Sequence, residues 1–235
     1  MSDGVLVLWD VDHTLVDAGG VGVRAFRLAF RRLFGRELVE LPMMAGRTDR
    51  AIAIDLLRAN GVPDPGPYLE PFRAAAEEIL VDLADELRTR GRALPGALDA
   101  LAALARANAV QTVLTGNIRS FAEAKMRAYG LIEHLDLDIG AYGWADPVRA
   151  ALVEIARSAA SRRHGRLFTG TATVLVGDTP RDVEAALATG AAVVGVATGR
   201  YTLAELRAAG AATVLPDLTD TAAVRTAILG ATPTT

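Results

Sequence analysis

The feature that most constrains the fold of this chain is a repeated alternation of short apolar runs with segments whose apolar residues recur at helical spacing. Runs of this length, apolar at successive positions, are typical of strands that are buried on both faces. Such strands alternate with helices in parallel sheets that helices cover on two sides, so the sequence predicts an α/β fold. The predicted strands are 5–9, 110–117, 135–143, 172–178, 191–199 and 212–216. The predicted helices of this part are 95–107, 119–129, 147–163, 180–189 and 202–209.

One connection is much longer than a crossover between parallel strands requires. From about residue 17 to residue 91 there is no strand pattern, and a cluster of Pro and Gly at 61–67 interrupts the segment. Its apolar residues recur at helical spacing in three stretches, 26–34, 51–58 and 68–91. We therefore expect residues 17–91 to form a helical cap domain, inserted into a core made of residues 1–16 and 92–235.

Composition and charge exclude several kinds of function. The 235 residues carry a formal net charge of −3 and no run of Lys or Arg, so we expect neither nucleic acid nor an anionic membrane as a partner. The chain has no Cys and only three His, which excludes disulfides and thiol catalysis and argues against a Cys/His zinc site. No basic segment precedes the first apolar run, and that run is too short for a signal peptide or a membrane span. We therefore expect a cytoplasmic protein, monomeric or homodimeric.

Three of the predicted strands end in, or are followed by, residues that could bind a ligand, at the edge where a parallel sheet binds its ligands. In chain order they are Asp10, Asp12 and Thr14, then Thr115, Gly116 and Asn117, then Asp178 and Asp182. Carboxylates that gather at one edge repel one another and raise each other's pKa, and a hard divalent cation relieves the repulsion. An oxygen-only site with few ligands suits Mg²⁺. The alternative, that these acids only cap helices or begin turns, is the simpler interpretation of any one of them but not of the set.

The same residues carry a resemblance to the haloacid dehalogenase superfamily. The stretch "DVDHTL" (10–15) matches the family's DxDxT signature, and "VLTGN" (113–117) resembles its second motif, a Ser or Thr that ends the next core strand. The stretch "VGDTPRDVEAA" (176–186) resembles the fourth motif, GDxxxD. The helical insertion corresponds to the C1-type cap of phosphatases similar to phosphoglycolate phosphatase and β-phosphoglucomutase. The resemblance therefore implies a Rossmann-like core with an inserted α-helical cap.

The resemblance implies a different role for each of the first two carboxylates. Asp10 would be the nucleophile that attacks phosphorus and forms an aspartyl-phosphate. Asp12 would be the general acid for the leaving alkoxide and then the general base for the attacking water. The dehalogenases of the superfamily lack an acid at the second position, because an ester product needs no protonated leaving group there. Asp12 therefore points to phosphoryl transfer.

The resemblance also implies a magnesium site. Asp10, Asp178 and the backbone carbonyl of Asp12 would hold the ion, which draws a dianionic phosphate towards the nucleophile. Asp182 would support the water shell of the metal or a cationic side chain.

A phosphate site is implied beside the metal. Thr115 and the backbone N–H groups near Asn117 would bind phosphate oxygens at the start of the following helix. Thr14 and Gly116, from the same two motifs, are further candidates for contact with the substrate.

The third motif departs from the family pattern. The family has a Lys at the start of the helix before the last catalytic strand, whereas this region reads "GWADPVRAALVEIAR" (143–157) and no Lys follows Lys125. Arg149 could supply the positive charge. Its guanidinium can bind two oxygens at once, whereas the ammonium of a Lys acts as a point charge. Lys125 is the alternative, but we expect it about 12 Å along its helix from the strand ends. Its simpler interpretation is a solvated helix residue.

The predicted cap offers one more candidate, the stretch "AGRTDRAI" (45–52), which resembles a loop that C1 caps lower over the active site. Arg47 could then contact the substrate beyond its phosphate. Equally, Thr48 or Asp49 could cap the next helix while Arg47 is exposed. His13 stands where the family more often has Gly, either as a local variation or as a residue that lines the cap entrance.

These observations predict a Mg²⁺-dependent phosphomonoester hydrolase that acts on a small phosphorylated metabolite. A phosphomutase of the same superfamily would use the same aspartyl-phosphate. A signalling receiver domain also phosphorylates an Asp, but that Asp ends a middle strand and receivers lack a cap. A member that binds phosphometabolites without turnover is the remaining alternative. The sequence does not indicate the substrate.

Overall fold

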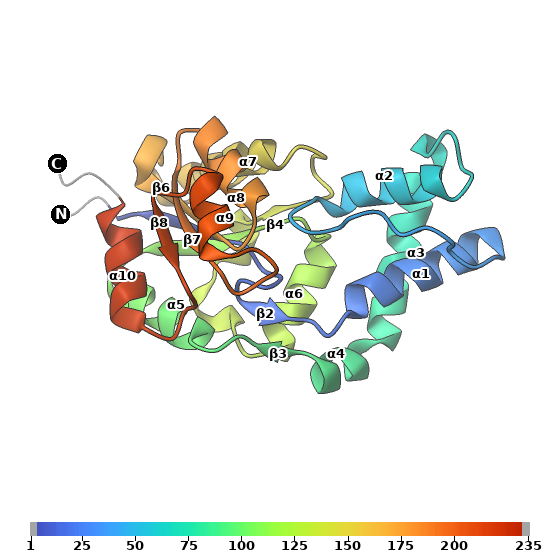
Figure 1. The fold of residues 1–235 in the computed structure, drawn as a ribbon, viewed down its shortest axis with the longest axis horizontal. Coiled ribbons are helices and arrows are strands. Elements are labelled where there is room, and N and C mark those ends of the chain that lie inside the picture. The colour runs from blue at the N-terminus through green and yellow to red at the C-terminus, as the bar shows by residue number, and fades with distance from the viewer. Residues whose placement is uncertain (1–3, 232–235) are drawn as a thin grey trace.

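The computed structural model describes residues 4–231, which form a layered α/β part and a cluster of helices beside it (Figure 1). The strands of the layered part are β1 (Leu6–Trp9), β4 (Val110–Thr115), β5 (Ala141–Tyr142), β6 (Thr173–Gly177), β7 (Ala192–Val196) and β8 (Thr213–Leu215). They form one sheet in the order β5-β4-β1-β6-β7-β8, and every neighbouring pair is parallel. The predicted α/β fold is thereby confirmed.

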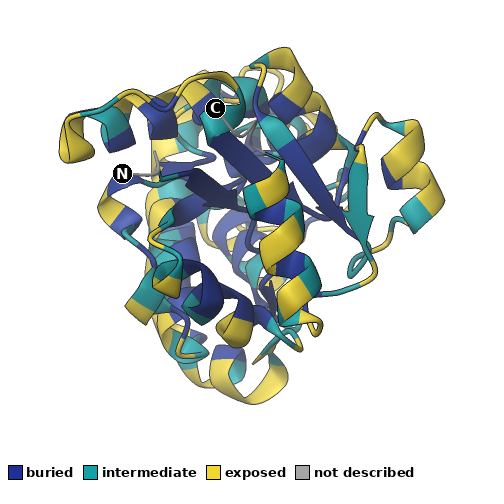
Figure 2. Ribbon diagram, turned by 90° about the vertical axis from the view of Figure 1, so that its left-hand side faces the viewer, coloured by how far each residue is buried: buried dark blue, intermediate teal, exposed yellow. Residues whose placement is uncertain are grey.

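Both faces of the sheet are buried. Val7 and Trp9 point to one face and pack with helices α5 (Ala97–Arg106), α6 (Arg119–Ala128) and α10 (Thr221–Gly230). Leu6 and Leu8 point to the other face and pack with α7 (Arg149–His164), α8 (Pro180–Ala188) and α9 (Leu203–Ala208). Figure 2 shows the inner strands buried and the outer faces of the helices exposed. A strand covered on both faces needs apolar residues at successive positions, which accounts for the unbroken runs in the sequence.

The predicted strand 135–143 is wrong over most of its length. The chain forms the 3-10 turns η2 (Ile132–His134) and η3 (Leu137–Ile139), and only β5 joins the sheet. The side chain of Asp136 accepts a hydrogen bond from the Asp138 N–H and caps η3. An acid that bonds to a neighbouring backbone N–H stabilises a turn at the expense of an extended strand. Helix α10, in contrast, is an element that the sequence pattern did not indicate.

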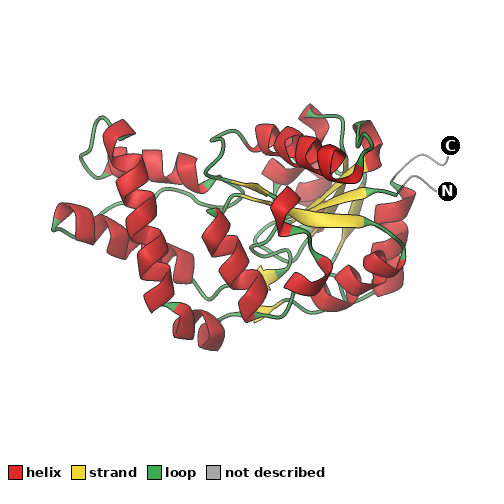
Figure 3. Cartoon of the chain, turned by 180° about the vertical axis from the view of Figure 1, so that it is seen from behind, coloured by secondary structure: helices red, strands yellow, loops and turns green. Residues whose placement is uncertain are grey.

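All regular elements between β2 (Val16–Asp17) and β3 (Arg92–Ala93) are helical. They are α1 (Val21–Phe34), α2 (Asp49–Ala59), η1 (Gly66–Tyr68), α3 (Leu69–Asp82) and α4 (Ala84–Arg90). These helices share an apolar cluster of their own, to which the α6 region adds Ile118 and Phe121. Figure 3 shows them at the end of the molecule opposite the termini.

The two short strands β2 and β3 pair antiparallel where the chain leaves the sheet and returns to it. This pairing supports a division into a cap of residues 17–91 and a core of residues 1–16 and 92–235, which we keep as a proposal. Residues 1–3 and 232–235 of that core lie outside the described part of the chain.

The helices are of ordinary length for a globular protein. Among the described residues the longest is α7, with 16 residues, followed by α1 and α3 with 14 each. Within residues 4–231 no helix has the length and apolar character needed to cross a membrane. Helices of this size gain most of their stability by packing one apolar face against a neighbour, here the sheet or one another.

Candidate active site

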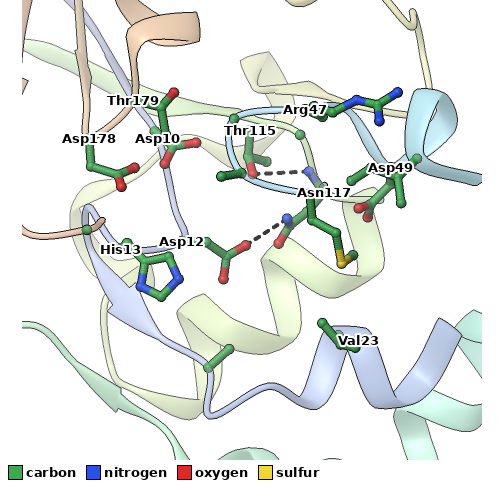
Figure 4. Close-up of a pocket in the computed structure, with 18 of the residues that line it drawn as sticks. Asp10, Asp12, His13, Val23, Arg47, Asp49, Thr115, Asn117, Asp178 and Thr179 are labelled. Atoms are coloured by element: carbon green, nitrogen blue, oxygen red, sulfur yellow. Dashed lines mark hydrogen bonds between the residues drawn. The ribbon is translucent and has the colours of Figure 1, made fainter. Parts of the chain in front are cut away.

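The carboxyl ends of three neighbouring strands form the floor of a cavity of about 500 Å³ (Figure 4). Because β1 lies between β4 and β6, the residues that follow or end these strands, Asp10, Thr115 and Asp178, come together. Residues of α1, of α2 and of the loop before α2 line the opposite side. The cavity thus lies between the sheet edge and the helical cluster.

Asp10 is buried at the centre of this floor. The Arg149 guanidinium donates to Asp10 Oδ1 at 2.5 Å, and the Thr14 hydroxyl donates to Oδ2 at 3.2 Å. Burial, together with the negative charge of Asp182, raises the pKa of Asp10 to about 7 in spite of the opposing charge of Arg149. Thr14 does not line the cavity and is fully buried, so it differs from the expected substrate contact. Its hydroxyl is turned to Asp10 and orients that carboxyl group.

Three buried acids form a group that could hold a metal ion. Asp10, Asp178 and Asp182 each offer a carboxylate oxygen, and these oxygens lie within 4.8 Å of one another. Burial and the charges of Asp10 and Asp182 raise the pKa of Asp178 to about 9. Asp178 Oδ1 is buried and has no hydrogen-bond partner in the described part of the chain. A buried oxygen without a partner is costly, and a set of oxygen ligands fits Mg²⁺.

Asp182 is held more tightly by protein groups than Asp178. Its Oδ2 accepts hydrogen bonds from the Thr179 backbone N–H at 3.1 Å and from the Thr179 hydroxyl at 2.6 Å, which completes a capping box at the start of α8. Its Oδ1 lies 2.5 Å from Arg149 Nη2 in an ion pair. Of the two roles expected for Asp182, the geometry therefore matches support of a cationic side chain.

The carboxylate of Asp12 points away from this acid group. Lys125 Nζ donates to both of its oxygens at 2.7 Å, and the Asn117 side-chain amide donates to Oδ2 at 2.8 Å. Burial alone would raise the pKa of Asp12, but the charge and hydrogen bonds of Lys125 and Asn117 outweigh it and hold the pKa below its ordinary value. The pKa of Asp10 is therefore raised and that of Asp12 lowered, although the two residues are only two positions apart in the sequence.

The expectation that Lys125 is a solvated residue distant from the strand ends is wrong. Its side chain is buried and lines the cavity. Helix α6 begins at Arg119 rather than directly after Thr115, so Lys125 lies only in its second turn. Side chains on a helix lean towards its N-terminus, which carries the ammonium group back to the strand ends.

Arg149 is the first residue of α7 and is buried at the same floor. Its contacts with Asp10 and Asp182 agree with the expectation that it leans over the carboxyl edge of the sheet. Its Nε is buried without a hydrogen-bond partner among the described residues. Arg149 therefore lies beside Asp10 and Lys125 beside Asp12, whereas the sequence indicated these two cations as alternatives.

The turn after β4 lies against the loop that precedes α2. The Asn117 N–H donates to the Thr115 hydroxyl at 3.1 Å. A Cβ atom added at Gly116 would lie 2.0 Å from the Arg47 carbonyl oxygen, so only glycine allows the two backbones to approach this closely. Thr115, Gly116 and Asn117 all line the cavity, and their contact with phosphate remains a prediction.

The start of α2 is docked on the sheet edge. Thr48 is the N-cap residue, and its hydroxyl accepts from the Ala51 N–H at 3.3 Å. The Asp49 N–H donates to the Gly116 carbonyl at 2.6 Å, and the Arg50 N–H donates to the Gly143 carbonyl at 3.2 Å. The first N–H groups of a helix have no acceptor within the helix, and here carbonyl groups of the core accept their hydrogen bonds.

Arg47 does not reach towards Asp10 and Asp12. Its guanidinium donates to Asp55 at 2.5 Å and to the carbonyl of Met43 at 3.2 Å. Figure 4 shows it turned away from Asp10 and Asp12. Capping by Thr48 is therefore the alternative that the structure favours for this loop, although Arg47 is half-buried rather than exposed.

Asp49 lines the cavity, although the sequence indicated only a possible helix cap at this position. It is 6% exposed. Its Oδ2 accepts a hydrogen bond from the Ile118 N–H at 2.7 Å. Burial raises the pKa of Asp49 to about 7, against the lowering effect of this hydrogen bond and of Lys125. An acid directly after an N-cap Thr, in a loop expected over the site, was the available signal.

His13 lines the cavity, which favours the second of the two interpretations of this residue. Its backbone has φ of 61°, in the left-handed region that favours glycine. This conformation explains why Gly is more usual at the position. Figure 4 shows the imidazole beside Asp12.

Known proteins resemble the chain in sequence and in fold. It is 32% identical over 208 residues to the probable phosphatase IndB of Dickeya dadantii (strain 3937), which covers 87% of this chain and 86% of that protein. A hydrolase from Pseudomonas syringae superposes with a TM-score of 0.67 at 23% identity, over 92% of this chain and 95% of the other. A predicted phosphoglycolate phosphatase from Haemophilus somnus 129pt superposes with a TM-score of 0.67 at 17% identity, over 96% and 99%. The two superpositions show a shared fold.

The sequence also matches a known family over most of its length. Residues 7–187 match the model of the haloacid dehalogenase-like hydrolases, and this range contains Asp10, Asp12, Thr115, Arg149 and Asp178. The match covers more than half of the chain and agrees with the Rossmann-like core. This protein is a member of the haloacid dehalogenase-like hydrolase family.

Proposed function

We propose that this hydrolase is a Mg²⁺-dependent phosphatase that cleaves small phosphomonoesters through an aspartyl-phosphate on Asp10. Phosphatase is the enzyme class that the family and the similarity to a probable phosphatase support. The observation that carries the proposed mechanism is the contrast between two carboxylates. Asp10 lies beside an acid group that could hold a metal, and Asp12 lies outside that group, paired with Lys125.

In the first step, a carboxylate oxygen of Asp10 attacks phosphorus and the bond from phosphorus to the alcohol oxygen breaks. Arg149 and Thr14 hold the carboxylate in place for this attack. Asp12 gives a proton to the leaving alcohol oxygen. Asp12 must be protonated for this step. An incoming phosphate would favour its protonation, because the phosphate competes for Lys125, the group that keeps Asp12 ionised.

In the second step, water attacks phosphorus and the bond from phosphorus to Asp10 breaks, which releases inorganic phosphate. Asp12, now ionised, takes the proton from the attacking water. Lys125 and Arg149 oppose the negative charge on the transferring phosphoryl group, so two cations share the task of the single Lys expected from the family pattern.

The residues present fit a magnesium ion. Asp10, Asp178 and the backbone carbonyl of Asp12 would hold it, with Asp182 behind them in contact with Arg149. The ion would supply positive charge for the phosphate and relieve the repulsion among the buried acids. Its fit to Asp178 rests on the carboxylate oxygen that lacks a protein partner.

The test is phosphate release from a panel of phosphomonoesters that includes 4-nitrophenyl phosphate. We expect turnover with Mg²⁺, none in EDTA, and a fall of about a thousandfold or more for Asp10→Asn. Asp82→Asn is the matched control, because Asp82 is an exposed acid at the end of α3 and does not line the cavity. An Asp10→Asn rate as high as about a tenth of the wild-type rate would contradict the proposal.

Product analysis separates the phosphatase from a phosphomutase, which the same aspartyl-phosphate could also serve. A phosphatase releases inorganic phosphate and the free alcohol in equal amounts, whereas a phosphomutase returns a rearranged phosphoester. The receiver alternative does not fit a chain that belongs to a hydrolase family and carries both acids directly after its first strand.

A further inference from the structure

The cavity has two chemically different ends. The floor holds the charged residues described above, whereas the end under the helical cluster is mainly apolar. The apolar lining residues there are Val23, Phe26, Met44, Ile52 and Phe121. Figure 4 shows Val23 on this side, across the cavity from Asn117. A phosphoester whose phosphate lies on the floor must place its alcohol part against these side chains.

Three cations of the described lining already have carboxylate partners. Lys125 is paired with Asp12, and Arg149 with Asp10 and Asp182. The guanidinium of Arg47 is paired with Asp55.

The remaining basic lining residues are both exposed and belong to the core. His13 lies beside Asp12, and the Arg200 guanidinium lies over the ring of Tyr201. A carboxylate or a second phosphate buried against Phe26, Ile52 and Phe121 would therefore lose water where the neighbouring side chains offer no counter-charge, which is unfavourable.

The carboxylate of Asp49, at the start of α2 and beside the turn after β4, has an oxygen without a partner in the described part of the chain. Asp49 Oδ2 accepts the hydrogen bond from Ile118, but no donor among the described residues binds Oδ1. Figure 4 shows this carboxylate on the far side of Asn117 from Asp12, away from the catalytic floor. An ionised carboxylate accepts hydrogen bonds only, so its natural ligand is an O–H or N–H group.

We propose that the substrate is a phosphoester of an uncharged alcohol with an apolar body and an O–H or N–H group that donates to Asp49 Oδ1. This inference rests on the proposed phosphatase function and adds the chemical class of the leaving alcohol. It excludes esters whose alcohol part carries a carboxylate or a second phosphate. Asp49, held beside Asn117 by the Ile118 N–H, is thus the residue that selects the alcohol part of the substrate.

The probes are three esters with one scaffold: benzyl phosphate, hydroxymethylbenzyl phosphate and carboxybenzyl phosphate, the last two as 3- and 4-substituted isomers. They differ in the presence of a donor or a negative charge. For the wild-type protein with Mg²⁺ at about pH 8, above the pKa of about 7 for Asp49, we expect kcat/KM for carboxybenzyl phosphate about tenfold or more below that for benzyl phosphate. At least one hydroxymethyl isomer is expected to exceed benzyl phosphate.

Asp49→Asn is the informative variant, because its amide oxygen can still accept from the Ile118 N–H while its NH₂ group replaces Oδ1 with a donor. We expect the ratio of kcat/KM for the better hydroxymethyl isomer over benzyl phosphate to fall about tenfold or more, as for loss of a hydrogen bond to a charged group. The penalty on carboxybenzyl phosphate should shrink. Asp82→Asn should leave all ratios unchanged.

The outcomes separate the two proposals. Turnover of 4-nitrophenyl phosphate together with equal rates for benzyl and carboxybenzyl phosphate would overturn the substrate class and leave the phosphatase standing. An equal loss on all three esters in Asp49→Asn would mean that Asp49 only holds the loop, and would also overturn it. If no ester is turned over, the phosphatase proposal fails, and calorimetric binding of the matching benzyl phosphonates still tests the same ratios.

Discussion

Lys125 Nζ lies 2.7 Å from both carboxylate oxygens of Asp12, across 113 positions of the sequence. The ammonium group also donates to the Asn117 side-chain carbonyl at 2.5 Å, and Asn117 donates to Asp12 in turn. The three side chains form a closed set that keeps Asp12 ionised, although burial alone would favour the neutral acid. Lys125 is therefore placed to control when Asp12 carries a proton.

The first prediction concerns this control. Lys125→Met removes the charge that holds the pKa of Asp12 down, so the pKa rises and the base form is lost at a higher pH than in the wild type. We expect a lower kcat and an acid limb of the pH profile of kcat that moves upward, while Lys125→Arg moves it less. Rate measurements from about pH 5 to 9 check this. An acid limb that stays in place would show that Lys125 acts only on the phosphate.

The second prediction concerns Arg149, which contacts Asp10, the proposed nucleophile. Arg149→Ala leaves Asp10 and Asp182 close together without their shared cation, so Asp10 becomes a poorer nucleophile and the phosphoryl group loses a donor. We expect kcat to fall about 100-fold or more, further than in Lys125→Ala, with partial recovery in Arg149→Lys. Steady-state rates of the three variants decide the order. A reversed order would assign the main catalytic cation to Lys125.

The third prediction concerns the nucleophile itself. Asp10→Asn keeps the size of the side chain but removes the attacking carboxylate. We expect turnover to fall about a thousandfold or more, with a far-ultraviolet circular dichroism spectrum like that of the wild type. A variant that keeps a tenth of the wild-type rate would contradict the assignment of Asp10.

The fourth prediction concerns Asp178 in the absence of metal. Its pKa rises from 3.8 to about 9 on folding, so the folded state holds this proton more strongly than the unfolded state does. Stability of the metal-free protein should therefore fall as pH rises from about 4 to about 9. Asp178→Asn removes this penalty and should melt higher than the wild type at about pH 8 in EDTA, yet bind Mg²⁺ more weakly. Unchanged Mg²⁺ affinity in the variant, measured by calorimetry, would remove Asp178 from the metal site.

The fifth prediction concerns the pH dependence of stability that Asp49 causes at the start of α2. The pKa of Asp49 rises from 3.8 to about 7 on folding, so its ionised form destabilises the folded protein above about pH 7 and has no such effect below about pH 4. Asp49→Asn should gain about 1 to 3 kcal/mol of unfolding free energy at about pH 8, reduced by up to about 1 kcal/mol for the lost charge at the start of α2. Urea denaturation at both pH values checks it. A gain of equal size at about pH 4 would point to a cause other than ionisation.

The sequence was informative wherever a local pattern carried the information. A buried strand must be apolar throughout, so the point where the run stops marks the sheet edge, and Asp10 and Asp178 stand at such points. The same reasoning failed for 135–143, where Asp136 bonds to its neighbouring backbone and a turn forms instead of a long strand. Apolar content alone does not distinguish the two, because turns that pack on a core are apolar as well.

By itself, then, the sequence determined the parallel α/β core, the helical insertion and the acids at the strand ends, because these depend on residue spacing within short segments. Only the tertiary structure decided that Lys125 meets Asp12 and that Asp49 meets the Ile118 N–H. These contacts join residues 113 and 69 positions apart. They depend on where α6 begins, on how it lies against the sheet, and on the docking of α2 at Gly116. Such geometry arises from packing between elements, and the spacing of residues within any one element does not encode it.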